Sequence, residues 1–435
     1  MAGALLSIAS QALNTAETAL MVTANDTANS NNPNFVNETA NLSTGAVVGP
    51  IADTLPNVLP SGVMVAGITS ASDPVLRRVI QQHQSSAGYW NQLATEQSAI
   101  QPLFNEPQTG GLQEMLAAFG SAWTTLADHP GSSAEAASVL QRGKALASTI
   151  QSLQGQLAQQ ATSITQQLST QMTTLATTSQ TLANANGTQA SLPPNSQGSN
   201  QLQAHVASAL QQLASSASIQ TLTAADGSVQ VSSGGIALVS GTTTPPANTY
   251  QVHLHGTGPW YTQTATLRIA GAVYTPERGA IAGNLAALQQ IQSAGQQLAQ
   301  LSQALAKNVP TGNAGSLTHL FTATANGALT IASGVTASTL HAKASTTALT
   351  AIQTATQHWT HIVGDVASAG NLATTQQTRQ QADLAALQTQ QQSVQGVNLN
   401  QAAATTAQEQ EAYQAAAKLV QVQQSVVNTL LTSIS

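Results

Sequence analysis

Residues 5–27, LLSIASQALNTAETALMVTANDT, and residues 413–434, YQAAAKLVQVQQSVVNTLLTSI, carry the two patterns that decide the fold. In both stretches apolar and small residues recur at steps of three and four, which places them on one face of a helix. Two such stripes, one near each end of the chain, predict an antiparallel coiled coil that brings the ends together. The alternative is a pair of ordinary amphipathic helices that cap a single globule. The two stripes consist of Leu6, Ala9, Leu13, Ala16, Leu20, Thr23 and Thr27, and of Tyr413, Ala416, Val420, Gln423, Val427, Leu430 and Ile434.

The composition is unusually poor in charge. The chain has 435 residues with 10 Lys+Arg, 16 Asp+Glu and a net charge of −6, and charged residues make up 6%, against about 25% in an ordinary soluble protein. Nucleic-acid binding is disfavoured because it needs clustered Lys and Arg. Intrinsic disorder of the whole chain is also disfavoured, because 42% hydrophobic residues are enough to build a core. The absence of cysteine excludes disulfides, thiolate metal sites and thiol catalysis.

Targeting signals are also missing from the sequence. No Lys or Arg precedes Arg77, so the basic region of a secretory signal peptide is absent. No run approaches the ~18 apolar residues that a membrane-spanning helix needs. We therefore expect no membrane insertion and no passage through the general secretory pathway.

The interior of the chain changes from helical to strand periodicity and back. Leu153 to Leu182 keeps helical spacing, with Gln and Thr in place of charges on the polar face. Such a surface suits packing against many copies of something, although a composition bias of the source lineage is an equal alternative. Alternating patterns follow the turn signals Asp226-Gly227 and Gly234-Gly235, and Asn326-Gly327 centres a second short β unit.

These patterns predict a mainly α fold with paired terminal helices, a helical-bundle domain and a small β-rich insertion. The expected organisation is an N-terminal axial helix with an Asn-rich segment (1–40), a linker (41–72), the first part of the helical domain (73–215), a β-rich insertion (216–278), a return helix (279–310), a short β unit (311–345), the last part of the helical domain (346–392) and a C-terminal axial helix (393–435).

The sequence contains few patterns that are typical of catalytic or metal-binding sites. His253 and His255 share one face of an expected strand, and His358 and His361 lie one helical turn apart. A zinc site needs a third ligand and supporting carboxylates, and neither pair lies in a recognisable motif, so we interpret them as surface or half-buried histidines. Phosphate-binding loops and the G-x-S-x-G nucleophile motif are absent. The sequence predicts no enzyme, no cofactor and no metal.

The segment after the first stripe, Ala24 to Phe35 (ANDTANSNNPNF), resembles the Asn-rich signature S-N-N-I-A-N-x-N-T-P-G-Y of bacterial flagellar axial proteins. Near the other end, residues 391–400 (QQSVQGVNLN) resemble the S-x-S-G-V-N-L-D-E-E segment of the hook-associated protein 1 family. Residues 410–420 (QEAYQAAAKLV) are similar to the Q-x-A-Y-Q-A-x-A-K-[LI]-[IV] helix of that family. The N-terminal signature is common to rod, hook and hook-associated proteins. The C-terminal signature narrows the resemblance to the hook-associated protein 1 family.

The resemblance extends inward from both ends. Residues 62–65 (GVMV), Asp73 and residues 76–78 (LRR) resemble the link that follows the signature. The next helices are matched by Phe119, Ala122, Trp123, Leu126, Ala127, Pro130, Val139, Leu140, Gly143, Lys144, Leu146 and Ala147. The middle of the chain is shorter than in typical members of the family.

The resemblance implies a structural protein of the bacterial flagellum that joins hook to filament. It implies a ring of subunits whose partners are further copies of this chain, the hook protein, a second hook–filament junction protein, and an export chaperone at the C-terminal helix. It also implies type III export to an extracellular location without a cleaved signal peptide. Another axial component (hook or rod) and a non-flagellar surface adhesin are the alternatives. The implied assembly interface consists of Leu6, Leu13, Leu20, Asn25, Ala28, Asn29, Asn31, Pro33, Val397, Asn398, Leu399, Tyr413, Val420, Val427, Leu430 and Ile434.

Overall fold

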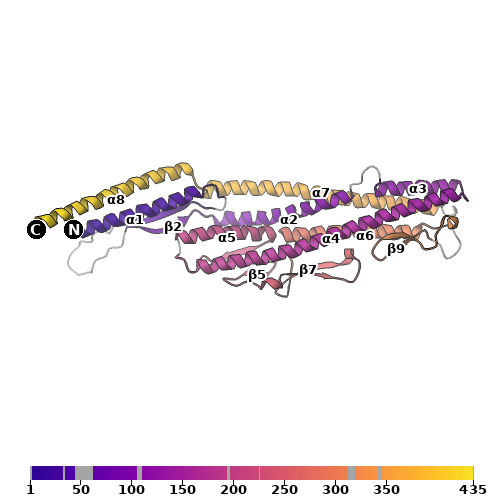
Figure 1. The fold of residues 1–435 in the computed structure, drawn as a ribbon, viewed down its shortest axis with the longest axis horizontal. Coiled ribbons are helices and arrows are strands. Elements are labelled where there is room, and N and C mark those ends of the chain that lie inside the picture. Colours follow the sequence, from indigo (N-terminus) through magenta and orange to yellow (C-terminus); the bar gives the residue numbers. More distant parts are fainter. Residues whose placement is uncertain are drawn as a thin grey trace.

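The protein is an elongated, mainly helical molecule (Figure 1). This computed structural model describes residues 2–32, 35–44, 62–104, 110–193, 196–224, 226–311, 319–340 and 345–434. Helices α1 (Ala2–Ala28) and α8 (Leu399–Ile434) lie side by side at one end, where both chain termini are found. They run in opposite directions, and we call them the axial pair.

The remaining helices form a long body that extends away from the axial pair (Figure 1). Helix α2 packs along α7, α6 and α5, while α4 packs along α6, α3 and α5. The elements of the body are α2 (Pro74–Phe104), α3 (Leu112–Asp128), α4 (Ser133–Gln189), α5 (Gln197–Ser216), α6 (Ala280–Asn308) and α7 (Ser345–Gln395).

The longest helix, α4, shows how a chain with so few charges builds helices. The Ser132 side chain accepts a hydrogen bond from the Glu135 N–H at its start, and Glu135 lies in the first turn, where a negative charge is favourable. Along one face the apolar residues are buried, and along the other Thr hydroxyls donate to carbonyls four residues back. The helix predicted from Leu153 to Leu182 is thus confirmed. Its buried apolar face includes Leu146, Ile150, Leu153, Leu157, Ile164, Leu168, Met172, Leu175 and Leu182.

Aromatic side chains concentrate in the core of the body at the end far from the axial pair. The ring of Phe119 lies 5.5 Å from that of Phe321 and 6.0 Å from that of Trp123, centroid to centroid. Phe104 and Trp359 stack at 5.7 Å and join α2 to α7. Such pairs add about 0.5–1.5 kcal/mol each beyond the area that they bury.

Helix α2 approaches its neighbours so closely that glycine is required at two contacts. A Cβ atom on Gly88 would collide with the Ser215 carbonyl oxygen of α5. A Cβ atom on Gly283 of α6 would lie 2.5 Å from the Tyr89 carbonyl oxygen. Because the obstacle is backbone in both cases, no side chain can move aside to make room. The two glycines therefore set the spacing of the bundle.

The β-rich insertion lies along one side of the body (Figure 1). It contains two antiparallel three-stranded sheets, ordered β3-β4-β5 and β6-β7-β8, and two of its strands contact α4. The predicted turns at Asp226-Gly227 and Gly234-Gly235 connect consecutive paired strands. The strands are β3 (Gln220–Thr223), β4 (Val229–Ser233), β5 (Ile236–Val239), β6 (Gln251–His255), β7 (Thr264–Ile269) and β8 (Ala272–Tyr274).

One side chain anchors this insertion to α4. Asn186 is buried; its Nδ2 donates to the carbonyl oxygens of Val229 and Gly241, both at 2.8 Å, and its Oδ1 accepts from the Val229 N–H at 2.9 Å. A second hairpin, β9 (Phe321–Ala323) with β10 (Leu329–Ile331), forms around the predicted turn at Gly327 and covers α4 and α6.

The described parts of the expected linker, residues 41–44 and 62–72, include strand structure. Strands β1 (Glu38–Thr44) and β2 (Val63–Ser70) pair as an antiparallel ribbon that packs on α1. The Thr15 hydroxyl donates to the Val63 carbonyl oxygen at 2.9 Å and ties the ribbon to the helix. The two strands are separated by a long stretch of sequence. No short turn signal therefore marks them as a hairpin. The predicted fold class itself, mainly α with antiparallel terminal helices, a helical body and a small β-rich insertion, is confirmed.

Candidate assembly interface

The axial pair buries small side chains rather than large ones. On α1 the buried face runs along Ala9, Ala16 and Ala19 with Thr15 and Val22, and on α8 the buried residues include Ala402, Ala416 and Gln423. Small residues allow two helix backbones to approach closely, but each removes little apolar surface from water. The contact between α1 and α8 is therefore close and contributes little hydrophobic stabilisation per residue.

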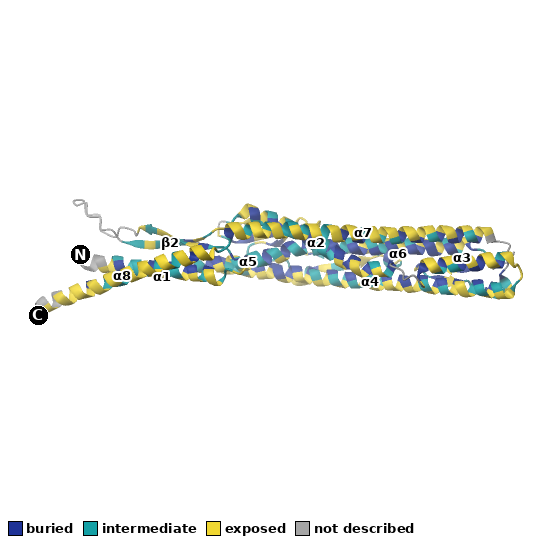
Figure 2. Ribbon diagram, turned by 90° about the horizontal axis from the view of Figure 1, so that it is seen from above, coloured by how far each residue is buried: buried dark blue, intermediate teal, exposed yellow. Residues whose placement is uncertain are grey.

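The larger apolar side chains of the axial pair face outward. Leu6 is 44% exposed on α1, and Leu419 and Val422 are 56% and 60% exposed on α8. Figure 2 shows the difference, with a buried interior along the body and mostly exposed or intermediate residues along α1 and α8. Exposed large apolar residues on the described part of the pair are Leu6, Met21, Leu399, Tyr413, Leu419, Val422, Val426 and Val427.

The residues of the two predicted stripes fall into a half-buried group and an exposed group. Leu13 and Leu20 on α1 and Val420 on α8 are half-buried, whereas Leu6, Tyr413 and Val427 are exposed. The stripes placed small and large residues on one contact face, but in the structure the small residues make most of that contact. Met21, Leu419, Val422 and Val426 were missed because neither stripe includes them. Leu430 and Ile434 have side chains outside the described part of the structure, and Pro33 lies outside the described residues.

The Asn-rich segment ends helix α1. The Asn29 side-chain Nδ2 donates to the backbone oxygen of Asn25 at 2.9 Å and to its Oδ1 at 3.1 Å, which satisfies acceptors of the last turn. Asn25 and Asn29 are half-buried, and Ala28 and Asn31 are exposed. These residues thus set where the chain leaves α1, and two of them also present surface to solvent.

The corresponding segment before α8 starts that helix. The Asn398 Oδ1 accepts from the backbone N–H groups of Asn400 at 3.1 Å and Gln401 at 3.3 Å, as an N-cap does. Asn398 and Val397 are half-buried and line a cleft against the end of α1, and Leu399 is exposed. The body and the axial pair meet at this point, which we call the joint.

Two buried carboxyl groups occupy the joint. Asp26, in the last turn of α1, is 3% exposed, and Glu38, the first residue of β1, is 5% exposed. The Glu38 backbone N–H lies 3.1 and 3.3 Å from the two carboxyl oxygens of Asp26. Burial raises the pKa of Asp26 from 3.8 to about 7; the Glu38 N–H opposes the increase and the Glu38 charge adds to it.

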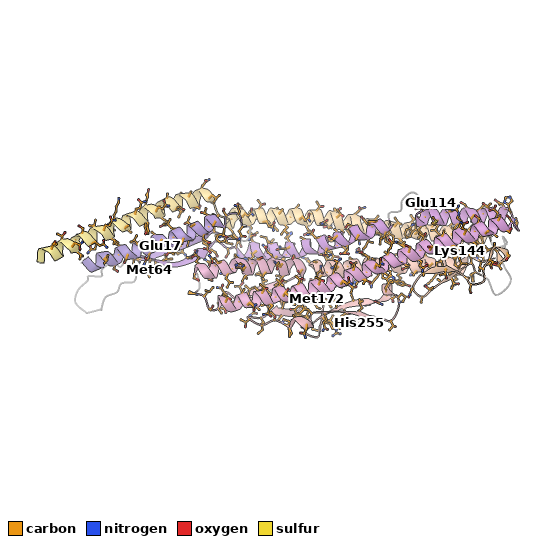
Figure 3. The ribbon with its side chains drawn as sticks, in the orientation of Figure 1. Glu17, Met64, Glu114, Lys144, Met172 and His255 are labelled. Atoms are coloured by element: carbon orange, nitrogen blue, oxygen red, sulfur yellow. The ribbon has the colours of Figure 1, made fainter. Side chains whose placement is uncertain are left out.

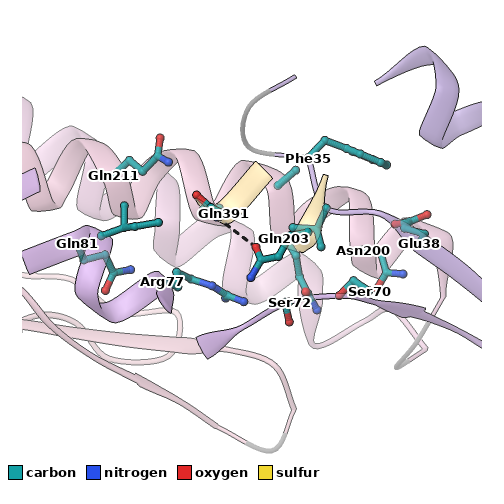
Figure 4. Close-up of a pocket in the computed structure, with 15 residues that line it drawn as sticks. Phe35, Glu38, Ser70, Ser72, Arg77, Gln81, Asn200, Gln203, Gln211 and Gln391 are labelled. Atoms are coloured by element: carbon teal, nitrogen blue, oxygen red, sulfur yellow. Dashed lines mark hydrogen bonds between the residues drawn. The ribbon is translucent and has the colours of Figure 1, made fainter. Parts of the chain in front are cut away.

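The surroundings of Glu38 come mainly from the body. Burial raises its pKa, and hydrogen bonds with the side chains of Asn200 and Asn25 partly offset that increase. Figure 4 shows the pocket on this side of the joint, where Glu38 and Asn200 line one end and Arg77 of α2 lies further along. Burial lowers the pKa of Arg77, and the nearby Asp73 carboxylate opposes the shift. This pair was not predicted, because Asp26 and Glu38 are isolated acids in a polar stretch of the sequence.

The histidine pairs do not form a metal centre among the described residues. The rings of His253 and His255 lie 6.2 Å apart on an exposed strand edge, and His358 and His361 are exposed on α7. Within the described ranges no three His, Cys, Asp or Glu side chains are close enough to hold an ion. In Figure 3, Glu17 is labelled on α1, and Glu114 and Lys144 are labelled far along the body. None of the described helices combines the length and the apolarity that crossing a bilayer requires.

The antiparallel terminal helices, the long helical body and the outward-facing apolar side chains define a helical structural protein. Residues 97–319, just over half of the chain, match the family model described as the flagellar hook-associated protein FlgK helical domain. The chain belongs to this family and is a flagellar hook-associated structural protein. The matched range excludes the two terminal segments that carry the Asn-rich and C-terminal signatures, but it includes the helical residues 119–147 that also carry the resemblance.

Among solved structures, the chain is similar to the flagellar hook junction protein FlgK from Burkholderia pseudomallei, with 22% identity and a TM-score of 0.46. The similarity covers 57% of this chain and 47% of that one, so this chain spans about half the length of that protein. No curated protein matches the sequence.

Proposed function

We propose that this protein joins the hook to the filament of the bacterial flagellum and assembles through its axial pair. The observation that carries the proposal is the axial pair itself, whose contact is made mainly of small side chains while Leu6, Leu419 and Val422 are exposed to solvent. Apolar surface of this kind is typical of a contact with another protein. Family membership supports the flagellum as the place where that contact forms.

The family resemblance implies the proposed partners, and this surface is where we expect them to bind. Further copies of the chain would form a ring in which α1 and α8 pack against their neighbours. The hook protein would bind on one side of the ring and a second hook–filament junction protein on the other. Before assembly, an export chaperone would cover the exposed apolar side chains of α8, which include Leu419, Val422 and Val426. The work is structural, without catalysis.

The proposal includes export through the flagellar type III apparatus to the cell exterior. Deleting Ala2 to Leu20 removes most of α1 and should leave the protein inside the cell. A control inserts two residues at the exposed turn Ala270-Gly271 between β7 and β8, which should not affect export. Normal export of the α1 deletion would contradict this part of the proposal.

Two alternatives place the protein elsewhere: another axial position in the hook or rod, and a surface adhesin outside the flagellum. An epitope inserted at Ala270-Gly271 lies on an exposed turn and should not disturb assembly. Gold-labelled antibody and electron microscopy of isolated hook–basal bodies should then mark one narrow band at the distal end of the hook. Label along the whole hook or rod would support the first alternative, and label on the cell surface would support the second.

A further inference from the structure

The joint connects the axial pair to the body through a few contacts centred on two buried acids. The Asp26 carboxyl of α1 accepts from the backbone of Glu38, at the start of β1. One residue earlier, the Asn37 N–H donates to the Gln395 carbonyl oxygen at the end of α7, at 2.8 Å. The carbonyl oxygen of Asn37 accepts from the Ala71 N–H at 3.0 Å. These bonds place the acid pair where α1, β1, β2 and α7 meet.

Among the described residues, no Lys or Arg side chain forms an ion pair with either carboxyl group. The charged groups that face the pair are Glu409 of α8, which lines the cleft next to Asp26, and Arg77 of α2, which lines the pocket next to Glu38. Asp73 lies beside Arg77. Among the described residues, the one ion pair within 4.0 Å joins Arg379 and Asp383, both on α7. The other polar neighbours of the pair are the neutral side chains of Asn25, Asn200 and Gln395.

The geometry also disfavours two negative charges at this place. Asp26 is two residues from the C-terminal end of α1, where the helix dipole is negative and repels an anion. The Glu38 Oε2 atom is buried without a hydrogen-bond partner among the described residues. Buried carboxylates that lie close together cannot both ionise without a large cost in free energy.

We propose that Asp26 and Glu38 form a proton-dependent latch, which holds α1 to β1 while the pair carries a proton and loosens the joint when that proton is lost. With one carboxyl neutral, the other can accept the available hydrogen bonds without a like charge beside it. When both are ionised, repulsion and the cost of burial favour opening, so that water reaches the carboxylates. The flexibility of the axial pair relative to the body then depends on pH.

The direction of the pH dependence follows from the pKa of Asp26, which is raised from 3.8 to about 7 on folding. Between these two values the folded chain binds more protons than the unfolded chain, so stability decreases as pH rises through that range. The stabilising effect of the proton is fully present below the lower value. It is lost once the pH has passed the upper one.

Amide hydrogen exchange on the full-length chain tests the latch. Exchange rates of peptides covering residues 20–44 are divided by the intrinsic rates at each pH, which gives a protection factor. From about pH 5.5 to about pH 8.5, on either side of the Asp26 pKa, we expect protection in this segment to fall roughly tenfold or more, since one pKa unit corresponds to a tenfold change. Peptides from α4 should keep constant protection factors.

Matched variants separate the latch from general effects of pH. Asp26→Asn removes the titrating group but keeps an oxygen that can accept from the Glu38 N–H, so protection at residues 20–44 should no longer depend on pH. Glu38→Gln removes the neighbouring charge and should move the midpoint of the transition to lower pH. Glu17→Gln changes an exposed acid on the same helix and should behave like the parent chain.

A spectroscopic measurement covers the case in which a variant folds poorly. In the parent chain, infrared difference spectra should show a protonated carboxyl band that titrates near neutral pH and is absent in Asp26→Asn. The proposal is contradicted if protection in the parent chain does not change with pH, if Asp26→Asn keeps the change, or if no carboxyl band titrates above about pH 5, well above the unfolded Asp value of 3.9.

Discussion

The body and the axial pair bury different kinds of side chain, although both are built from low-charge helices. The body encloses Trp123, Phe119 and Leu157, each almost fully buried, whereas the axial pair encloses Ala9, Ala16 and Ala19. Fully burying a Leu or Phe side chain contributes about 1.5–3 kcal/mol, and a methyl group about 0.8 kcal/mol. We therefore expect the body to fold by itself, and we propose that the axial pair uses its larger apolar surface to contact other molecules.

The largest expected effect is a cavity in the aromatic core of the body. Phe119→Ala removes a ring that contacts Trp123 and Phe321, and should lower the free energy of unfolding by about 3–5 kcal/mol. Urea denaturation followed by tryptophan fluorescence measures the change. A loss below about 1 kcal/mol, within the range of ordinary surface substitutions, would show that the aromatic cluster does not hold the body together.

A smaller effect is expected where the β-rich insertion meets the body. Asn186→Ala removes three hydrogen bonds to the backbone of the insertion and leaves buried backbone groups unpaired, at a cost of about 1–3 kcal/mol. Hydrogen exchange should show faster exchange in residues 226–241, with α6 unchanged. The control is Asn184→Ala on the exposed face of the same helix. Equal exchange rates in the two variants would contradict the role of Asn186 as an anchor of the insertion.

The axial pair should respond to added rather than to removed volume. Ala16 is buried on α1, and Ala16→Leu would force α1 away from its neighbours at a cost of about 1–3 kcal/mol. The loss should be confined to the pair, so the main thermal transition of the body stays in place while residues 5–28 lose protection. The control Ala24→Leu adds the same volume at an exposed position of the same helix. If the two variants lose equal protection, close packing of α1 is not what the alanines provide.

The smallest effect on stability is expected at the outward face of α8. Leu419→Asp with Val422→Asp changes two side chains that are more than half exposed, so the free energy of unfolding should change by less than about 0.5 kcal/mol for each. Assembly should nevertheless fail, with hooks present and filaments detached. Circular dichroism of the purified variant measures its stability, and electron microscopy of cells that produce it shows whether filaments are attached. Normal filaments would mean that this face is not an interface.

The same comparison explains what could be predicted from the sequence. Long helices such as α4 and tight turns such as Asp226-Gly227 depend on local periodicity and turn chemistry, and both were predicted. The ribbon of β1 and β2 was not predicted, because its strands are separated in the sequence and the ribbon packs on α1. The outward residues Leu419 and Val422 were missed, since on an Ala-rich helix several faces have the same spacing. Asp26 and Glu38 were missed because burial, which makes them unusual, is a property of the folded chain.

The central claim is that the outward face of the axial pair is covered by neighbouring molecules in the flagellum. Since the chain has no cysteine, Leu419→Cys introduces a single thiol on this face, and Val273→Cys introduces one on the exposed insertion as a matched control. Maleimide labelling is measured on the purified monomer and on isolated flagella. We predict that both thiols react in the monomer, and that in flagella the thiol at 273 still reacts while that at 419 is protected. Equal labelling of the thiol at 419 in the monomer and in the flagellum would contradict the account.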